Sequence, residues 1–587
     1  MIKAMDNIHV AKLLDETADL MEIAAEDGFR IRSYRNAAKT IEGYPESVMS
    51  IVADPQRKVT EIAGIGKGIA HILGEIAGRG SFDRRDEMLE KYPPTALEML
   101  KIQGLGPKSI AVLIETFRVS TIDDLERLCR EQKLRGLPRM GAKLEEKILK
   151  SIAIYRRSAG RFLIDFATAT AEELQELFAG LPGVESVSAA GSLRRGKETI
   201  GDVDILVAGP NAVVALDHFA KWSKVDELLA KGENKASARV GVEGIQVDVR
   251  ALPMENFGAA MQYFTGSKEH NVALRTRAVK KGWTLNEYSL SRESDGKVIA
   301  SATEEEIYAA LGLMWIAPEL RENTGEIEAA EKGTLPKLLE LEQMRGDLHM
   351  HTRESDGRGT MEEMAAAAKA MGYEYIVITD HSKALAMANG LDEKRVLDFA
   401  KLVRGIGENE LGLKVFSGIE CDILKDGRMD LDDEALGALD FVVASVHSHM
   451  NLDETAMTER LLAALENPYI HAMGHPTGRV LLHRDAYAYA FEKVAARAAE
   501  RGVFMEINAS PERLDLHAAL IRSAKARGCR FTISTDAHHQ RHFANMRFGV
   551  MMARRGWLEK KDVVNTLGRR EFESTIRDAR ALRLSGG

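Results

Sequence analysis

Seven apolar runs between residues 343 and 587 constrain the fold of this chain more than any other feature. We expect each run to form a strand, and Ala-rich segments with helical spacing, such as 362–371 and 491–501, lie between them. Strands joined by helices run parallel, so seven alternations predict a parallel α/β barrel. A polar residue follows at the carboxyl end of each run, and a barrel brings those ends to one rim.

The polar residues at these strand ends are mostly histidines and carboxylates, and twelve of the sixteen histidines lie between His349 and His542. His349 and His351 are two residues apart on an expected strand and therefore share one side. One such histidine alone is more often a hydrogen-bonded structural residue. A convergent set of nine instead predicts a site for two or three Zn²⁺, Mn²⁺ or Fe²⁺ ions. The nine candidates are His349, His351, Asp356, His381, Glu420, His447, His475, Asp536 and His538.

A second carboxylate cluster lies upstream. Asp202 and Asp204 point to the same side of an expected strand, and adjacent carboxylates repel each other unless a cation such as Mg²⁺ lies between them. Asp248, on another expected strand, completes a triad. The stretch 191–195 (GSLRR) offers backbone N–H groups, the Ser192 hydroxyl and two guanidinium groups, all of which bind phosphate. Asp-x-Asp alone is common by chance, but the combination predicts metal-assisted phosphoryl chemistry.

Glycine-rich turns recur in the first 150 residues. Two Gly-x-Gly turns, in 62–70 and 102–110, each join an apolar helix end to a new helix, and 137–143 is a looser copy. The pattern resembles the helix-hairpin-helix motif, which holds a DNA phosphate through turn amides without reading sequence. One copy could be an ordinary helical turn, whereas three favour DNA binding. The resemblance implies DNA contacts, and room for a monovalent cation at the turns, for Gly64, Gly66, Gly68, Gly104, Gly106 and Lys108.

Length and composition indicate an ordinary globular protein of several domains, because 587 residues exceed a single core. The net charge of −9 argues only mildly against nucleic-acid binding, since local clusters and turn amides can supply the contacts. Cys129, Cys421 and Cys529 are far apart, which indicates a reducing compartment. The start of the chain lacks a signal-peptide core and no apolar run reaches the length of a membrane span, so we expect a cytoplasmic, nucleoid-associated monomer without a membrane partner.

Two further motifs follow the carboxylate triad. The stretch 261–275 (MQYFTGSKEHNVALR) runs as an aromatic turn into a helix, and 285–290 (LNEYSL) comes after it. Together with the hairpins and the Gly-Ser…Asp-x-Asp…Asp pattern, they make residues 1–320 resemble a bacterial family X DNA polymerase of the nucleotidyltransferase superfamily. The resemblance implies a DNA-dependent polymerase that fills short gaps in base excision repair. Its partners would be gapped or primer–template DNA and deoxynucleoside triphosphates.

The same resemblance implies a role for each matching residue. The three carboxylates would hold Mg²⁺ or Mn²⁺ for a two-metal nucleotidyl transfer. Arg250, Glu287 and Tyr288 are similar to a switch that couples closure to site assembly. Arg275 would contact the template strand. The nucleotide would meet Gly191, Ser192, Arg195, Tyr263, Phe264, Gly266 and, at the base edge, Asn271.

Two positions depart from the family pattern. Lys268 stands where relatives place an Asp against the incoming base, so nucleotide affinity is expected to differ. Ile72 stands where lyase-active relatives carry the lysine that forms a Schiff base with 5′-deoxyribose phosphate. Lys67 is near that position but off the motif. We therefore expect no strong lyase activity.

The carboxyl-terminal ligand set resembles the PHP (polymerase and histidinol phosphatase) domain, whose hallmark is His-x-His followed by His, Glu and Asp ligands on a distorted seven-stranded barrel. In bacterial family X polymerases, such a module implies a 3′-to-5′ exonuclease with AP endonuclease and 3′-phosphatase activity. The implied metals are Zn²⁺ and/or Mn²⁺, with Mn²⁺ as activator. His449, His471 and His539 lie next to motif positions without matching them.

The expected fold is multidomain, with helical helix-hairpin-helix domains, an α+β nucleotidyltransferase palm and thumb, and a distorted (β/α)₇ PHP barrel. The expected domain boundaries are 1–80 and 81–150 for two helical DNA-binding domains, 151–252 for the palm, 253–320 for the thumb, 321–342 for a linker and 343–587 for the barrel.

Two other functions compete with this one. In the first, the polymerase is active and the barrel is a metal-stabilised docking module; the complete ligand set argues against it. In the second, the chain is a DNA-binding scaffold with an inactive transferase. A transferase for small molecules or RNA ends would share Asp-x-Asp but has no use for DNA-gripping hairpins.

Overall fold

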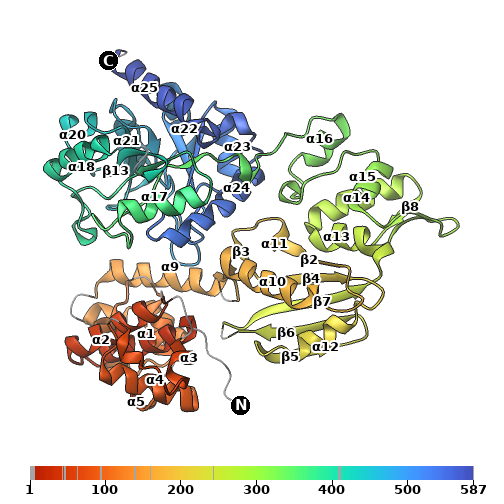
Figure 1. Ribbon diagram of the computed structural model, residues 1–587, viewed down its shortest axis with the longest axis horizontal. Helices are drawn as coiled ribbons and strands as arrows, with labels where there is room; N and C mark the ends of the chain where they lie inside the picture. Colours follow the sequence, from red (N-terminus) through yellow and green to blue (C-terminus); the bar gives the residue numbers. More distant parts are fainter. Residues whose placement is uncertain are drawn as a thin grey trace. The chain divides into compact units, whose positions relative to one another are not determined.

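The structure is a computed structural model that describes residues 7–42, 44, 48–62, 64–92, 95–102, 104–137, 140–158, 160–241, 243–406 and 411–585. It divides into two compact units (Figure 1). The first comprises Met1–Ala159 with Leu482–Arg484, and the second comprises Gly160–Leu481 with Asp485–Gly587. No helix among the described residues is long and apolar enough to cross a membrane.

The first unit is helical over its described residues, and apolar side chains at helical spacing, such as Leu14, Leu73 and Leu113, fill its core. Its helices are α1 (Asn7–Ile23), α2 (Gly28–Glu42), α3 (Val48–Ala53), α4 (Lys67–Arg79), α5 (Asp83–Lys91), α6 (Thr95–Leu100), α7 (Pro107–Phe117), α8 (Ile122–Arg130) and α9 (Ala142–Ser158), with 3₁₀ turns η1 (Val59–Glu61) and η2 (Lys133–Gly136).

Both strong Gly-x-Gly motifs lie between a helical turn and a longer helix. Gly66 and Gly106 cap the amino ends of α4 and α7. Gly64 and Gly104 have φ angles of +92° and +97°, which L side chains rarely adopt. Ala63 and Gln103 of these motifs, and Pro138 and Arg139 of the third copy, lie outside the described residues.

A five-stranded sheet, which we call the palm sheet, begins the second unit, with strand order β2-β4-β7-β6-β5. The odd-numbered residues of β4 pack in the core beneath α10 and α12, so Asp202 and Asp204 lie on the opposite face. A short pair, β1 (Phe162–Leu163) and β3 (Thr199–Ile200), flanks it. The elements are α10 (Ile164–Ala179), β2 (Ser186–Ala189), α11 (Gly191–Arg194), β4 (Asp202–Ala208), α12 (Val214–Ala220), β5 (Val225–Lys231), β6 (Lys235–Val240) and β7 (Ile245–Leu252).

The next segment has its own small core and a buried ion-pair network. Glu304 accepts two hydrogen bonds from Arg194 of α11, and the fully buried Arg321 donates to the same carboxylate. Because a buried charge needs a partner, this network ties the segment to the palm. Its elements are η3 (Met254–Asn256), α13 (Phe257–Thr265), α14 (Lys268–Lys280), β8 (Trp283–Leu285), β9 (Leu290–Arg292), β10 (Val298–Ala300), α15 (Glu304–Ala310), η4 (Pro318–Leu320) and α16 (Glu326–Lys332).

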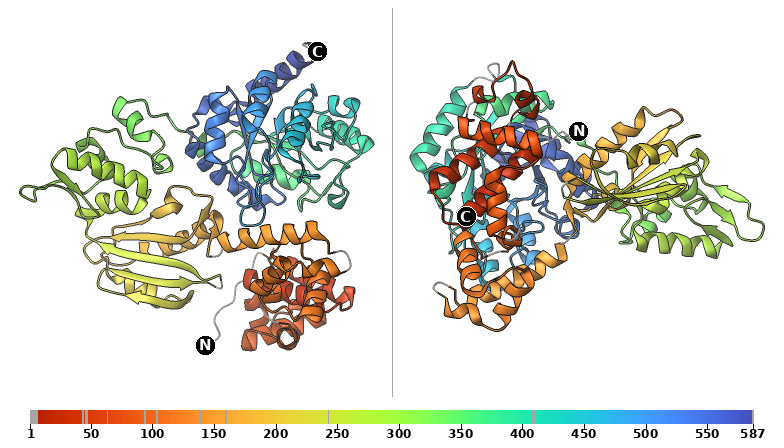
Figure 2. Two further views of the ribbon diagram at one scale, coloured as in Figure 1. Left: turned by 180° about the vertical axis from the view of Figure 1, so that it is seen from behind. Right: turned by 90° about the horizontal axis from the view of Figure 1, so that it is seen from below.

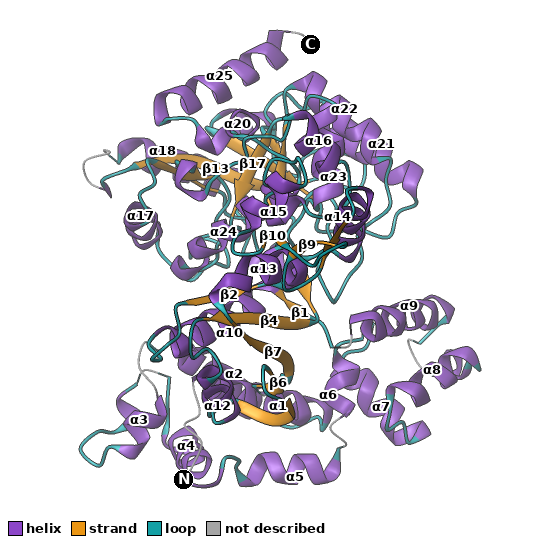
Figure 3. Cartoon of the chain, turned by 90° about the vertical axis from the view of Figure 1, so that its right-hand side faces the viewer, coloured by secondary structure: helices purple, strands orange, loops and turns teal. Residues whose placement is uncertain are grey.

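The third part of the second unit is the predicted barrel. All seven expected strands are present, and they pair in parallel in chain order. A bridge between Met350 and Ala537, just after the first and the last strand, links the two ends of the sheet. Figure 3 shows β13 and β17 of this barrel with helices around them. The predicted fold class is thus confirmed. The strands are β11 (Gly346–Asp347), β12 (Tyr375–Ile378), β13 (Lys414–Asp422), β14 (Phe441–Ser445), β15 (Ala472–Met473), β16 (Phe504–Asn508) and β17 (Phe531–Ser534).

Helices surround these strands (Figure 2). Apolar side chains fill the amino-terminal end of the barrel. Phe572 of α25 stacks on Tyr375 with ring centroids 4.5 Å apart. This plug leaves the carboxyl-terminal rim for polar residues. The helices are α17 (Met361–Ala370), α18 (Glu393–Gly405), α20 (Asp433–Gly437), α21 (Glu454–Leu465), α22 (Phe491–Arg501), α23 (Ala518–Ala526), α24 (Met546–Arg555) and α25 (Arg569–Ser585), with 3₁₀ turns η5 (Leu341–Gln343), η6 (Ala386–Ala388), η7 (Gln540–Asn545), η8 (Lys560–Asp562) and η9 (Val564–Thr566).

Candidate active sites

The palm carboxylates come together because β4 and β7 run parallel in a fixed register. Asp204 lies directly opposite Asp248, and Asp202 is opposite Gln246. The side chains of Asp202, Asp204 and Asp248 therefore share one face, as the alternation in sequence predicts. Asp202 is exposed, whereas Asp248 is buried.

The palm carboxylates do not have equal charge states. Burial and, to a smaller extent, the neighbouring carboxylates Asp202 and Asp248 together raise the pKa of Asp204 to about 7. Burial would also raise the pKa of Asp248, but hydrogen bonds from Lys235 and Ser237 outweigh it and lower that pKa. The Lys235 ammonium lies 2.6 Å from Asp248 Oδ2. An oxygen-rich cluster in which one carboxyl holds a proton until a cation replaces it suits Mg²⁺ or Mn²⁺.

The expected phosphate loop lies against this cluster. Gly191 begins α11 with a φ of +63°, and a Cβ there would lie 2.6 Å from Asp204 Oδ2, so only glycine fits. Ser192 is half-buried in α11. Arg195 follows the helix; its Nη1 donates to the carbonyl oxygen of Thr265 at 2.5 Å, and its Nε lies 3.2 Å from Glu322 Oε1. The guanidinium is thus held beside Gly266, another residue expected to contact nucleotide.

The remaining expected nucleotide contacts lie on α13 and α14. Tyr263 and Phe264 form an edge-to-face pair with centroids 5.1 Å apart. Asn271 is buried, and its Nδ2 donates to the Tyr263 carbonyl oxygen at 2.7 Å. Arg275 is exposed, and its Nε lies 3.4 Å from the Asn271 carbonyl oxygen. Lys268, the departure from the family pattern, is exposed at the start of α14.

Arg250 and Tyr288, two of the three expected switch residues, each contact a different part of the fold. The Arg250 guanidinium lies 4.2 Å from the centroid of the Phe264 ring. Tyr288 is 63% exposed, and its carbonyl oxygen accepts a hydrogen bond from Asn256. Among the contacts of the described residues, none joins Arg250 to Glu287 or Tyr288.

The candidate DNA-binding residues of the first unit are exposed. A Cβ on Gly66, Gly68 or Gly106 would meet nothing within 4 Å, so the backbone there is open to a ligand. Gly64 and Gly104 lie instead close to Thr40 and Leu144 and have a packing role. Lys108 is exposed in the first turn of α7. Ile72, at the expected lyase position, is buried in α4.

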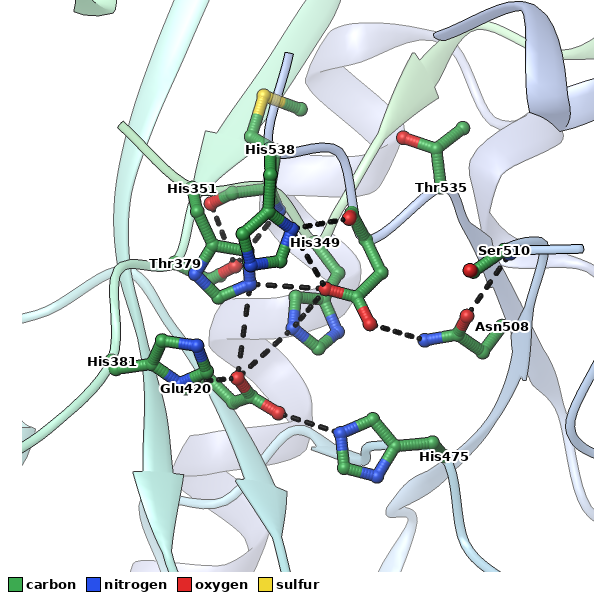
Figure 4. A network of polar contacts seen from close by, with 12 residues as sticks. His349, His351, Thr379, His381, Glu420, His475, Asn508, Ser510, Thr535 and His538 are labelled. Carbon is green, nitrogen blue, oxygen red and sulfur yellow. Dashed lines mark hydrogen bonds and ion pairs between the residues drawn. The ribbon is translucent and has the colours of Figure 1, made fainter. Parts of the chain in front are cut away.

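The candidate ligands converge at the carboxyl ends of the barrel strands, and Figure 4 labels six of them: His349, His351, His381, Glu420, His475 and His538. Eight of the nine candidates fall into groups that could hold a metal ion, whereas His475 belongs to none of these groups and contacts Glu420. Glu420 lies at the centre: its Oε2 is 2.8 Å from His381 Nδ1 and its Oε1 is 2.8 Å from His475 Nε2. His351 Nε2 lies 3.1 Å from Asp536 Oδ1. Three groups have ligand atoms within 4.8 Å of one another: His351, Asp356, His381 and His538; His349, His351 and Asp536; and His381, Glu420 and His447.

The electrostatics of this cluster fit cations. Burial and, after it, the nearby His538 and His381 lower the pKa of His351 to about 3, so the ring is neutral and can ligate. The pKa values of the buried Glu420 and the half-buried Asp536 carboxylates fall well below normal, because the charges of neighbouring histidines outweigh desolvation. Among the described residues, the buried His349 Nε2 and His351 Nδ1 find no hydrogen-bond partner. Buried ligand atoms left unpaired within one cluster fit a multinuclear metal site.

Four carboxylates that brace this cluster were missed at the sequence level. Glu506 Oε1 lies 2.7 Å from His349 Nδ1, and its Oε2 accepts a hydrogen bond from the His475 backbone N–H at 2.6 Å. Asp422 lies 2.5 Å from His447 Nδ1. Such partners fix the orientation and tautomer of a ligating histidine. The others are Asp347 and Asp380. All four carboxylates lie in or beside the strand-end runs of the sequence. That position alone does not distinguish a metal ligand from a residue that holds a ligand in place.

The three histidines left out of the ligand set lie outside the three groups. His471 is buried, and its ring stacks on Phe441 with centroids 5.0 Å apart while its Nδ1 accepts from the Val442 backbone N–H. His539 caps the amino end of η7. His449 has a positive φ of 51°.

Four segments of the chain match known domain families. Residues 5–82 match a helix-hairpin-helix domain, 96–153 a SAM-like helix-hairpin-helix tandem, 260–322 the DNA polymerase beta thumb, and 347–510 the PHP domain.

Three known proteins are similar to this chain over longer ranges. The DNA polymerase/3′-5′ exonuclease PolX of Bacillus subtilis is 33% identical over 97% of this chain and 99% of its own length. The DNA polymerase lambda of Rattus norvegicus is 26% identical over 54% of this chain and 56% of its own length. A probable phosphatase of Acetivibrio thermocellus is 33% identical over 33% of this chain and 78% of its own length. The chain therefore belongs to the family X DNA polymerases that carry a carboxyl-terminal PHP domain.

Proposed function

We propose that this protein is a DNA-dependent DNA polymerase that fills short gaps during repair and also resects 3′ ends with its barrel. The observation that carries the polymerase is the register of β4 and β7, which places Asp202, Asp204 and Asp248 on one face beside the Gly191–Arg195 loop. The ligand cluster on the barrel rim carries the nuclease. The domain boundaries given above are part of this proposal.

In the palm, the three carboxylates would hold two Mg²⁺ or Mn²⁺ ions, which supply activation of the primer 3′-hydroxyl and charge neutralisation at the triphosphate. Ser192 and Arg195 bind the triphosphate through a hydroxyl and a guanidinium. Gly266 and the Tyr263–Phe264 pair crowd the sugar and disfavour a ribose. Asn271 meets the base edge once its hydrogen bond to the Tyr263 carbonyl oxygen is exchanged.

In the barrel, the nine rim residues would hold two or three Zn²⁺ or Mn²⁺ ions, which supply an activated water and neutralise the scissile phosphate. The bracing carboxylates Glu506 and Asp422 keep His349 and His447 in fixed orientations. The substrates we propose are a phosphodiester at a 3′ end, an abasic site and a 3′-phosphate. We also propose that the protein is a monomer that works in the cytoplasm, near the nucleoid.

The palm assignment is tested by primer extension on a gapped duplex. The Asp202→Ala, Asp204→Ala double variant should lose extension and keep 3′-end resection. Extension by that variant would refute the assignment, and no extension by the wild type with either Mg²⁺ or Mn²⁺ would favour an inactive DNA-binding scaffold.

The barrel assignment is tested by resection of a 3′-recessed duplex without nucleotides. His349→Ala and Asp536→Ala should each abolish resection and spare extension. The matched control is His471→Ala, which removes a buried histidine of the same barrel that lies outside the ligand groups. Resection that survives in the first two variants would favour the docking-module alternative.

A further inference from the structure

Helix α24 of the barrel presents one face to the palm. Arg547, Met551 and Arg555 are spaced by four residues and therefore lie on one side of the helix. Arg547 Nη1 lies 2.6 Å from Glu172 Oε1 of α10. Arg555 Nη1 donates to the carbonyl oxygen of Arg195 at 2.5 Å. This face of α24 thus contacts the backbone of the loop that follows α11.

The loop at Gly196 is fitted to this helix. Gly196 has a φ of +67°, and a Cβ there would lie 2.4 Å from Met551 Cγ. Both the backbone conformation and the contact require glycine. Met551 in turn packs against the core that the palm and the barrel share. The backbone of Arg195 and Gly196 therefore packs on α24, and Arg195 carries the guanidinium that we assign to the triphosphate.

A single carboxylate connects the two sides of this contact. Glu322 Oε1 lies 3.2 Å from Arg195 Nε and 3.2 Å from Arg555 Nη1, and its Oε2 lies 3.3 Å from Lys197 Nζ. Burial opposes ionisation of Glu322, but these three cations outweigh it and lower its pKa. Arg555 is 7% exposed, so its charge depends on its partners, which are this carboxylate, the nearby Glu198 carboxylate and the Arg195 carbonyl oxygen.

We propose that Arg555, a residue of the nuclease barrel, is a positioning residue for nucleotide binding in the palm, and that it acts through Arg195. This inference rests on the proposed function of Arg195 as a triphosphate contact. Arg555 acts in two ways: it fixes the loop by its bond to the Arg195 carbonyl oxygen, and it shares Glu322. Without Arg555, Glu322 would attract Arg195 more strongly and hold its guanidinium away from an incoming phosphate.

The first test is hydrogen exchange, which does not depend on activity. Arg555→Met should speed amide exchange in residues 191–198. The matched control is Arg554→Met, which removes the neighbouring arginine that pairs with Glu319 and Glu340 instead. Unchanged exchange in Arg555→Met, or an equal increase in Arg554→Met, would overturn the inference whatever the polymerase does.

The second test is steady-state gap filling with a single deoxynucleotide. Arg555→Met should raise KM for the nucleotide about tenfold with kcat nearly unchanged, as loss of one charge-assisted contact predicts. Arg555→Lys should recover part of the loss, and 3′-end resection should be unaffected.

A double variant distinguishes an effect of Arg555 that passes through Arg195 from a general effect on the palm. In an Arg195→Met background, Arg555→Met should raise KM no further, because its effect passes through Arg195. Additive effects would contradict the inference. Failure of the proposed function would appear differently, as absence of extension by the wild type, and the exchange experiment would still decide the role of Arg555.

Discussion

Replacing Glu506 by glutamine should weaken metal binding in the barrel, although the substitution replaces none of the nine candidate ligands. Glu506 is buried; it contacts His349 Nδ1 at 2.7 Å and the His475 backbone N–H at 2.6 Å. Glutamine keeps the volume and one acceptor oxygen, so one charge-assisted bond is lost. Such a bond contributes ~1.5–3 kcal/mol, which corresponds to a metal affinity lower by roughly 10- to 100-fold.

The assay is 3′-end resection measured against Mn²⁺ concentration, with bound metal measured by elemental analysis after dialysis. Glu506→Gln should need roughly 10- to 100-fold more Mn²⁺ for half-maximal activity, and saturating Mn²⁺ should restore most of the rate. Primer extension should not change. A resection rate that Mn²⁺ cannot restore, with metal content equal to that of the wild type, would refute the bracing role and point to Glu506 acting on the substrate.

Three further predictions concern the polymerase portion. The pKa of Asp204, raised to about 7, means that a proton competes with the cation below pH 7, so the Mg²⁺ concentration for half-maximal extension should fall about tenfold from pH 6 to pH 8; a flat dependence would contradict this. The pKa of Glu304 is lowered to about 2 because Arg321 and Arg194 outweigh its burial, so it stabilises the fold above pH 4.5 by ~3 kcal/mol and loses this as pH falls toward 2. Arg194→Met should therefore destabilise the fold at pH 7 but much less at pH 2, measured by urea denaturation with Trp315 fluorescence, since Trp315 lies beside Glu304; equal losses at both pH values would count against the ion pair. Borohydride should trap no covalent adduct on 5′-deoxyribose-phosphate DNA, because Ile72 occupies the lyase position and is buried; a strong adduct would show that another amine serves.

Much of the fold and both site centres follow from periodicity in the sequence. The alternation along 202–207 places Asp202 and Asp204 on one face, and the strand–helix rhythm after residue 343 predicts a barrel whose strand ends meet. These patterns are local in the sequence, and the apolar residues that form them are buried in the core as expected.

Residues that act through a distant register were not predictable in this way. Lys235 pairs with Asp248 only because of the antiparallel alignment of β6 with β7, which no local pattern specifies. Glu506 and Asp422 belong to the same residue types and strand ends as the ligands, so only the distances separate their roles. Likewise, the contact between Arg555 and the Arg195 loop joins residues 360 positions apart.

The account's central claim is that one chain carries two independent metal sites, one that extends a 3′ end and one that removes it. The most direct measurement follows a single labelled primer in a gapped duplex with Mn²⁺, first without nucleotides and then with them, for the wild type, Asp202→Ala/Asp204→Ala and His349→Ala. We predict shortening then lengthening for the wild type, shortening alone for the palm variant, and lengthening alone for the barrel variant. Loss of both reactions in either well-folded variant would contradict the claim.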